Sequence, residues 1–133
     1  MIAAVADAHT AVWYRFNNPK LSEVAHQAIE EAFRAGDQIG VSSISLVEMV
    51  YLSEKGRIPP TAVEDLARAL LDPEYPLHEL PVHTSVARRM ASANREDVPD
   101  MPDRIIAATG LQYDVPVISR DRRIRASNIR SIW

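Results

Sequence analysis

Four acidic residues of this chain have the chemistry and the placement of divalent-metal ligands: Asp7, Glu48, Asp103 and Asp121. Asp7 directly follows the predicted strand Ile2–Ala6, and Asp121 comes just after the predicted strand Val115–Ser119. Cleaving a phosphodiester bond places negative charge on two oxygens, and Mg²⁺ or Mn²⁺ can offset that charge and lower the pKa of a water. Magnesium prefers oxygen ligands, so a few carboxylates from different elements suffice. Because crowded carboxylates repel one another without a cation, convergence of the four acids would predict metal-dependent phosphodiester chemistry.

Each acid also has a structural interpretation as part of a helix cap. Asp7 and Asp121 directly precede predicted helical segments, where aspartate is preferred as the N-cap. The spacing of Ser45–Glu48 fits a capping box. With Asp100 as an N-cap, Asp103 would lie in the first helical turn, where the helix dipole favours an acid. Taken one at a time, such acids are more often structural, so the spacing alone leaves both interpretations open.

Short strands that alternate with helices predict how these side chains are positioned. The apolar runs of strand length are Ile2–Ala6, Ile39–Ser42, Leu77–Val82, Val115–Ser119 and Ile129–Trp133. The helical patterns are Ala8–Phe16, Leu21–Gly36, Ile44–Lys55, Thr61–Leu71, Thr84–Ala93, Asp103–Tyr113 and the short turn Arg122–Ala126. This alternation is typical of a parallel α/β sheet covered on both faces. Such sheets bind ligands outside the carboxyl ends of their strands, where Asp7 and Asp121 are expected.

The composition predicts a single globular domain spanning residues 1–133. The chain is 47% hydrophobic and 25% charged, which is ordinary for a folded protein of this size. It has no cysteine, which excludes a disulfide framework, a thiolate metal site and a cysteine nucleophile, and which suits a reducing cytoplasm. No signal peptide and no apolar run of membrane-spanning length is evident. We therefore expect a cytoplasmic protein without a membrane segment.

Residues 119–133 form a basic strip in an otherwise acidic chain. They contain five arginines and one acid, a local charge of +4, so the rest of the chain carries −7 to give the net charge of −3. Such a strip could contact phosphates, or it could be a solvated surface of no further significance. The charge pattern alone favours neither interpretation.

Four sequence blocks resemble the signature segments of the PIN-domain family. They are VADAHTAVWY at Val5–Tyr14, VSSISLVEMVYLSEKGRI at Val41–Ile58, VPDMPDRIIAATG at Val98–Gly110 and VPVISRDRRIRAS at Val115–Ser127. The blocks occur in the family's order with its usual separations, and the resemblance covers essentially the whole chain. Within the family they are most similar to the VapC-type toxins of bacterial toxin–antitoxin pairs. One block alone would be weak evidence, but the four together are specific.

The resemblance implies a three-layer α/β/α fold with a central parallel sheet of four to five strands and an acidic pocket at the strand ends. It implies that Asp7 and Asp103 are the principal ligands of Mg²⁺ or Mn²⁺. Glu48 and Asp121 would complete the quartet and help to hold this ion or a second one. Ser119 stands where the family often has threonine or serine, and its hydroxyl would support the site.

The resemblance also implies an activity and its partners. The activity is that of a metal-dependent endoribonuclease, which hydrolyses RNA phosphodiester bonds as the toxin of a toxin–antitoxin system and so inhibits translation or growth. The implied partners are an RNA substrate such as tRNA or rRNA, a cognate VapB-type antitoxin and a second copy of the chain in a homodimer.

Some residues depart from the family pattern or have no assigned role. The residue after the first aspartate is often threonine in the family and is Ala8 here, so a hydroxyl is missing that Thr10 could partly replace. Asp100 is an additional acid, either a cap or a metal ligand through water. Arg104 follows Asp103 as in many relatives. A lone histidine such as His9 is more often structural than a ligand.

Aromatic residues and two rival functions complete the sequence-based expectations. Trp13 and Tyr14 could stack on a base, although side chains on a first helix more often pack in the core. A phosphoryl-transfer hydrolase with Asp7 as nucleophile would need an acid two residues later, where this chain has His9. A PIN-like module that only binds RNA or a partner would be favoured by loss of a central acid. All four acids are present.

Overall fold

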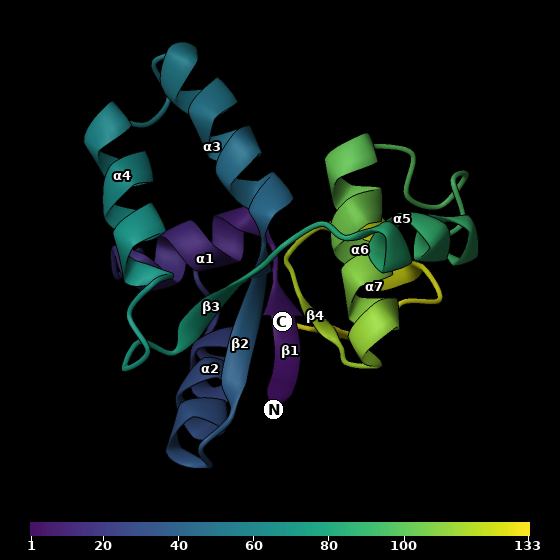
Figure 1. Cartoon of the computed structure of the whole chain (residues 1–133), viewed down its shortest axis with the longest axis horizontal. Helices are drawn as coiled ribbons and strands as arrows, with labels where there is room; N and C mark the ends of the chain where they lie inside the picture. Colours follow the sequence, from purple (N-terminus) through teal and green to yellow (C-terminus); the bar gives the residue numbers. More distant parts are fainter.

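The sheet has five strands, all parallel, in a computed structural model that describes residues 1–133 (Figure 1). The strands are β1 (Ile2–Ala6), β2 (Gln38–Ser42), β3 (Leu77–Leu80), β4 (Val117–Ile118) and β5 (Ser131–Ile132). Their order is β3-β2-β1-β4-β5, so the first strand of the chain is the central one. Ala6 at the end of β1 pairs with Val41 on one side and with Ile118 on the other. Asp7, the next residue, is therefore at the middle of the carboxyl edge of the sheet.

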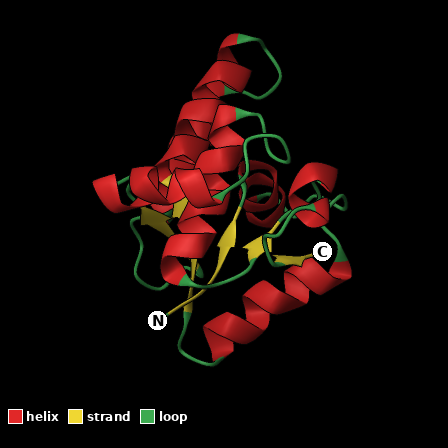
Figure 2. Ribbon diagram, turned by 90° about the vertical axis from the view of Figure 1, so that its right-hand side faces the viewer, coloured by secondary structure: helices red, strands yellow, loops and turns green.

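Helices cover both faces of this sheet and give three layers (Figures 1 and 2). They are α1 (Ala8–Arg15), α2 (Glu23–Arg34), α3 (Ser43–Glu54), α4 (Pro60–Ala69), α5 (Thr84–Arg89), α6 (Met101–Tyr113) and α7 (Arg122–Ala126), with the short 3₁₀ turn η1 (Met90–Ser92). Figure 1 shows α3 leaving the end of β2 and running with α4 away from the sheet. The predicted α/β class, the parallel sheet and its strand number are confirmed.

The two faces of the sheet bury separate apolar clusters because side chains alternate along each strand. Ala4 and Ala6 of β1 pack in one cluster with Ile29 of α2. Val5, between them, packs in the other cluster with Ile106 of α6. Strands that are buried on both faces have near-continuous apolar sequences, which explains why the runs seen in the sequence do not alternate with polar residues.

Helix and strand ends differ from the sequence-based expectation in a few places. The predicted helix Thr84–Ala93 changes to η1 at Met90 because two backbone carbonyls in this turn, those of Met90 and Ala93, accept hydrogen bonds from the buried side of the Arg104 guanidinium. α6 begins at Met101, two residues earlier than predicted, because Asp100 caps it. None of the helices combines the length and the apolar character needed to cross a bilayer.

Candidate metal centre

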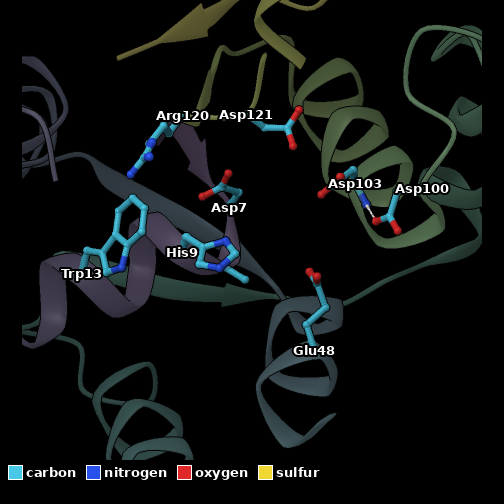
Figure 3. Close-up of a pocket in the computed structure, with 9 residues that line it drawn as sticks. Asp7, His9, Trp13, Glu48, Asp100, Asp103, Arg120 and Asp121 are labelled. Atoms are coloured by element: carbon cyan, nitrogen blue, oxygen red, sulfur yellow. Dashed lines mark hydrogen bonds between the residues drawn. The ribbon is translucent and has the colours of Figure 1, made fainter. Parts of the chain in front are cut away.

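The predicted acids meet in one pocket at the carboxyl edge of the sheet (Figure 3). The pocket has a volume of about 490 Å³ and is lined by Asp7, Ala8, His9, Trp13, Glu48, Asp100, Asp103, Arg120 and Asp121. The acids come from four separate parts of the chain: the end of β1, helix α3, the start of α6 and the turn after β4. All four acids singled out in the sequence thus line one pocket together with a fifth, Asp100, and of the four only Glu48 and Asp103 belong to the group with the closest carboxylate oxygens.

Asp7 is held by two hydrogen bonds, one to each carboxylate oxygen. Oδ1 accepts a hydrogen bond of 2.9 Å from the backbone amide of Thr10, so Asp7 caps α1 as the structural interpretation predicted. Oδ2 accepts a hydrogen bond of 2.5 Å from the hydroxyl of Ser119. Asp7 is 7% exposed and Ser119 is fully buried, so this contact is shielded from solvent. The same carboxylate is therefore a helix cap and a wall of the pocket.

Ser119 connects Asp7 to the turn that presents Asp121. Its hydroxyl oxygen accepts a hydrogen bond of 3.0 Å from the Asp121 amide while it donates to Asp7. Asp121 itself caps α7, since its Oδ1 accepts hydrogen bonds from the amides of Arg123 and Ile124. The structure thus places Ser119 between two of the pocket acids, where its hydroxyl can orient both.

Oε1 of Glu48 has no hydrogen-bond donor of the kind that holds Asp7 and Asp121. The predicted capping box is wrong, because α3 begins at Ser43 and its N-cap is Ser42, which leaves Ser45 and Glu48 inside the helix. The Ser45 hydroxyl and Oε1 of Glu48 are both buried and have no hydrogen-bond partner. Burial, and then the charges of Asp103, Asp100 and Asp7, raise the pKa of Glu48 to about 7. An unpartnered buried carboxylate oxygen that faces other acids is suited to bind a cation.

Asp103 faces Glu48 from the first turn of α6. Asp100 caps this helix by accepting a hydrogen bond of 3.2 Å from the Asp103 amide, as the structural interpretation predicted (Figure 3). Burial and the neighbouring carboxylates, Asp100 first among them, raise the pKa of Asp103 to about 7. One carboxylate oxygen from each of Glu48, Asp100 and Asp103 lies within 4.8 Å of the others. This spacing suits three oxygens around one divalent ion.

Asp100 is the pocket residue whose place the sequence left open. It acts as a cap and also belongs to the tightest group of carboxylates. The signal was present in the sequence, since Asp100 and Asp103 are three residues apart at a helix start. An N-cap side chain and an N3 side chain lie on the same side of the first turn, so a residue can be a cap and still face a site.

The remaining wall of the pocket is aromatic and basic. The rings of His9 and Trp13 pack with their centroids 5.4 Å apart, and the guanidinium carbon of Arg120 lies 5.6 Å from the centroid of the Trp13 ring. Figure 3 shows Trp13 and Arg120 on the side of Asp7 away from Glu48 and Asp103, and His9 between Trp13 and Glu48. Tyr14, by contrast, packs in the core and donates a hydrogen bond of 2.6 Å to Glu30.

Two smaller questions raised by the sequence have structural answers. Thr10 does not replace the hydroxyl that Ala8 lacks, because its side chain is fully buried and donates to the backbone carbonyl of Ile118. Arg104 donates to the carbonyls of Ala93 and Met90, at 3.1 and 2.7 Å. It therefore fixes the start of α6, with its two acids, against the segment that precedes it.

Comparison with known sequences places this geometry in a family. The model of the PIN domain matches residues 4–128. Ribonuclease VapC22 of Mycobacterium tuberculosis strain H37Rv is 30% identical to this chain over 126 residues, which cover 95% of this chain and 92% of the relative. The match includes every segment that contributes an acid to the pocket.

Solved structures share the fold at low sequence identity. The structure of VapBC2 from Rickettsia felis bound to a DNA fragment from its promoter has a TM-score of 0.71 and 14% identity, and covers 98% of this chain and 97% of that one. A toxin–antitoxin complex from Klebsiella pneumoniae has a TM-score of 0.64 and 21% identity, over 93% of this chain and 92% of that one. FitAcB from Neisseria gonorrhoeae has a TM-score of 0.60 and 19% identity, over 98% and 96%. With the fold, the family match and the acidic pocket in agreement, the chain belongs to the PIN-domain family.

Proposed function

We propose that this chain is a divalent-metal-dependent endoribonuclease that acts as the toxin of a toxin–antitoxin pair. The observation that supports it best is the buried, unpartnered oxygen of Glu48 among four other pocket acids. Proteins rarely leave such an oxygen without a donor unless an ion or a substrate completes it. The relative at 30% identity is named a ribonuclease, which indicates the substrate.

The donor set fits Mg²⁺ or Mn²⁺. It contains only carboxylate oxygens, with no cysteine in the chain, and both ions accept such ligands. Asp7 and Asp103 would hold one ion, and Glu48 and Asp121 would help to hold it or a second. Asp100 would join on the Glu48 side of the pocket. When bound, the ion would offset the charge that develops on the phosphate oxygens and make a water easier to deprotonate.

The protein's own contribution is to hold the carboxylates in place before RNA arrives. Ser119 donates to Asp7 and accepts from the Asp121 amide, so these two acids keep their orientation. Arg104 fixes the start of α6 and with it Asp103. Such supporting contacts around metal ligands typically change affinity or activity by 10–100-fold when they are removed. Without a cation the acids would repel a phosphate placed between them, so bringing the scissile phosphate to the acids depends on the ion.

The rival enzyme, with Asp7 as a covalent nucleophile, has little support. Both Asp7 oxygens accept hydrogen bonds, and the side chain is 7% exposed. His9, at the position where that chemistry needs an acid, packs against Trp13. A module that only binds RNA would not need an oxygen of Glu48 buried without a donor beside the carboxylates of Asp100 and Asp103.

The proposed context is cytoplasmic, with residues 1–133 acting as one domain. Its partners are an RNA substrate such as tRNA or rRNA, a VapB-type antitoxin and a second copy of the chain. The structures with similar folds include toxin–antitoxin complexes. Helix α3 exposes Val47, Val50 and Tyr51 to solvent, and apolar side chains grouped in this way suit a protein interface. The cleaved RNA would account for inhibition of translation or growth.

The test is RNA cleavage by variants at the two principal acids. We expect Asp7→Asn and Asp103→Asn each to lower kcat/KM by at least about 100-fold, while circular dichroism shows an intact fold. Glu54→Gln is the matched control, since Glu54 is an exposed acid on α3 outside the pocket. Retained cleavage in both aspartate variants, or cleavage by the wild type in EDTA, would disprove the proposal.

A further inference from the structure

The wall of the acidic pocket that contains no acid has the composition of a nucleotide site. Trp13 on α1 lies in contact distance of His9, and Arg120 from the turn after β4 stacks over its ring. Both His9 and Arg120 are exposed, and Trp13 is half-buried. In Figure 3 the indole and the guanidinium lie beside Asp7, on the side away from Asp103.

The aromatic wall continues into a second hollow. Trp13 packs against Trp133, with ring centroids 6.0 Å apart and planes inclined at 58°. Trp133 lines a neighbouring hollow of about 430 Å³ together with Arg122, Arg125, Ala126 and Ser131. The two hollows therefore meet at the Trp13–Trp133 pair. Trp13 lines the hollow that contains the acids, and Trp133, which also packs against the main apolar cluster, lines the hollow that contains two arginines.

Trp13 is not simply a core residue. Its neighbours Val12 and Tyr14 pack against the main apolar cluster, whereas Trp13 belongs to none of the apolar clusters. Its contacts are with His9, Trp133 and Arg120, and its ring lines the pocket. Because Trp13 is half-exposed and lines the pocket, its indole can contact a ligand there.

The arginines of this surface are free to bind anions. Arg120, Arg122 and Arg125 form no ion pair with any acid, whereas Arg130, in the same basic strip, pairs with Asp114 at 3.0 Å. A guanidinium binds a phosphate through two parallel hydrogen bonds and also stacks on aromatic and base rings. Unpaired arginines next to two indoles therefore match a ligand that has both a phosphate and a flat base.

We infer that Trp13 and Arg120, together with Trp133, Arg122 and Arg125, bind single-stranded RNA next to the acidic pocket. An unpaired base stacks on the Trp13–Arg120 side, and the adjoining backbone phosphate binds the arginines beside Trp133. The inference rests on the proposed ribonuclease function and adds to it a site that selects unpaired nucleotides. A base inside a duplex is covered on both faces and has no ring free for the indole, so duplex RNA is excluded from this site.

Binding can be measured without cleavage and with a signal that reports on this site. The chain has two tryptophans, Trp13 and Trp133, so its intrinsic indole fluorescence arises entirely at the proposed site. In EDTA, a single-stranded RNA hexanucleotide should quench this fluorescence to saturation. The same sequence as a blunt duplex should bind at least about tenfold more weakly. Quenching that is equal for the two forms would overturn the inference.

Variants of Trp13 and Arg120 distinguish the contribution of base stacking to RNA affinity from that of charge. With a fluorescein-labelled hexanucleotide and anisotropy as readout, we expect Trp13→Leu and Arg120→Ala each to weaken binding by about tenfold. Trp13→Phe should retain most of the affinity because a phenyl ring still stacks, and it keeps the test valid if Trp13→Leu is poorly folded. Arg88→Ala, which removes an exposed charge on α5, and Tyr113→Leu, which removes an exposed ring at the end of α6, are the matched controls.

The outcomes distinguish this inference from the proposed function. Asp103→Asn should abolish cleavage yet bind the hexanucleotide at least as well as the wild type, because it removes a negative charge near the strand. Trp13→Leu should keep the stabilisation by Mg²⁺ while its KM rises. If Arg120→Ala and Trp13→Phe bind RNA like the wild type, or if the variants weaken binding of a partner polypeptide and not of RNA, the inference is wrong.

Discussion

The two acidic sides of the pocket are built in different ways. On the Asp7 side, the protein supplies donors: the Thr10 amide and the Ser119 hydroxyl for Asp7, and two helix amides for Asp121. On the Glu48 side, Oε1 of Glu48 is buried without a donor, and burial beside other acids raises the pKa values of Glu48 and Asp103 to about 7.

The two sides therefore differ in what stabilises their carboxylates. The Asp7 side has its hydrogen bonds in place before any ion binds, so its acids contribute to the fold as well as to the site. The Glu48 side is unfavourable as a group of ionised carboxylates, and a proton or a cation relieves it. Substitutions on the two sides should therefore affect stability in opposite directions, and the ion should act mainly through one of them.

The largest expected effect is the stabilisation by the ion itself. At a Mg²⁺ concentration about 100 times its Kd, the free energy of unfolding of the wild type should rise by about 2.7 kcal/mol. Glu48→Gln should lose most of this gain because it removes a ligand from the group with the closest oxygens. Thermal unfolding with and without Mg²⁺ measures both values. The same gain in Glu48→Gln as in the wild type would contradict an ion on the Glu48 side.

Removal of the Asp7 side chain should be the most costly change in the absence of metal. In EDTA, Asp7→Ala should lower the free energy of unfolding by about 2 kcal/mol, because it removes an N-cap and leaves the Ser119 hydroxyl without its acceptor. Urea denaturation measures this loss. Asp103→Ala is the comparison on the other side and should be neutral or stabilising, so equal losses for the two variants would refute the distinction.

Ser119→Ala should also lower the free energy of unfolding, by less than Asp7→Ala does. The hydroxyl's loss leaves one Asp7 oxygen and the Asp121 amide without a partner, which should cost about 1 kcal/mol of stability. Cleavage should fall roughly tenfold, because the acids keep their chemistry but lose their orientation. Ser119→Thr should restore most of the stability and most of the cleavage, because it keeps a hydroxyl. A fully active Ser119→Ala variant would show that orientation by this hydroxyl is unimportant.

The smallest expected effect is the pH dependence of the metal-free protein. Between the ordinary pKa values of Glu48 and Asp103, 4.5 and 3.8, and their folded values of about 7, the native state holds protons that the unfolded state has lost. Stability from these groups is therefore fully present below pH 4 and is lost as the pH rises through 7. Partial exposure to solvent should keep the loss to about 1 kcal/mol or less.

Denaturation of the wild type and of Glu48→Gln/Asp103→Asn in EDTA, at pH 5 and pH 8, isolates this contribution. The wild type should lose more stability than the double variant over this interval, and saturating Mg²⁺ should reduce the difference. A double variant with the same dependence on pH as the wild type would mean that the two carboxyl groups titrate normally.

Much of the fold followed from local sequence patterns. Gly36 and Gly56 end α2 and α3 in the left-handed conformation, with φ of 83° and 72°, as their positions after helical segments indicated. The apolar runs located all five strands. The break at Met90 did not follow, because it depends on Arg104, eleven or more residues away along the chain. Local patterns contain no information about such a contact.

The site was less predictable from residue patterns alone than from the family resemblance. The cap interpretations of Asp7, Asp100 and Asp121 were all correct, and these residues nevertheless line the pocket. Capping and site formation use the same place at a helix start, so the alternatives were not exclusive. Glu48 gave the opposite result: its capping-box spacing was coincidental, because Ser42 and not Ser45 begins the helix.

The hydrogen bond between Ser119 and Asp7 joins residues 112 positions apart, across the neighbouring strands β1 and β4. A ribosome makes Asp7 before the other pocket acids, whereas it makes Ser119 and Asp121 only after them. The pocket therefore remains incomplete until residues 119–121 have been made. For an enzyme that cuts RNA, this order of synthesis has a consequence: we expect the nascent chain to stay inactive toward the RNA around it until β4 has docked beside β1.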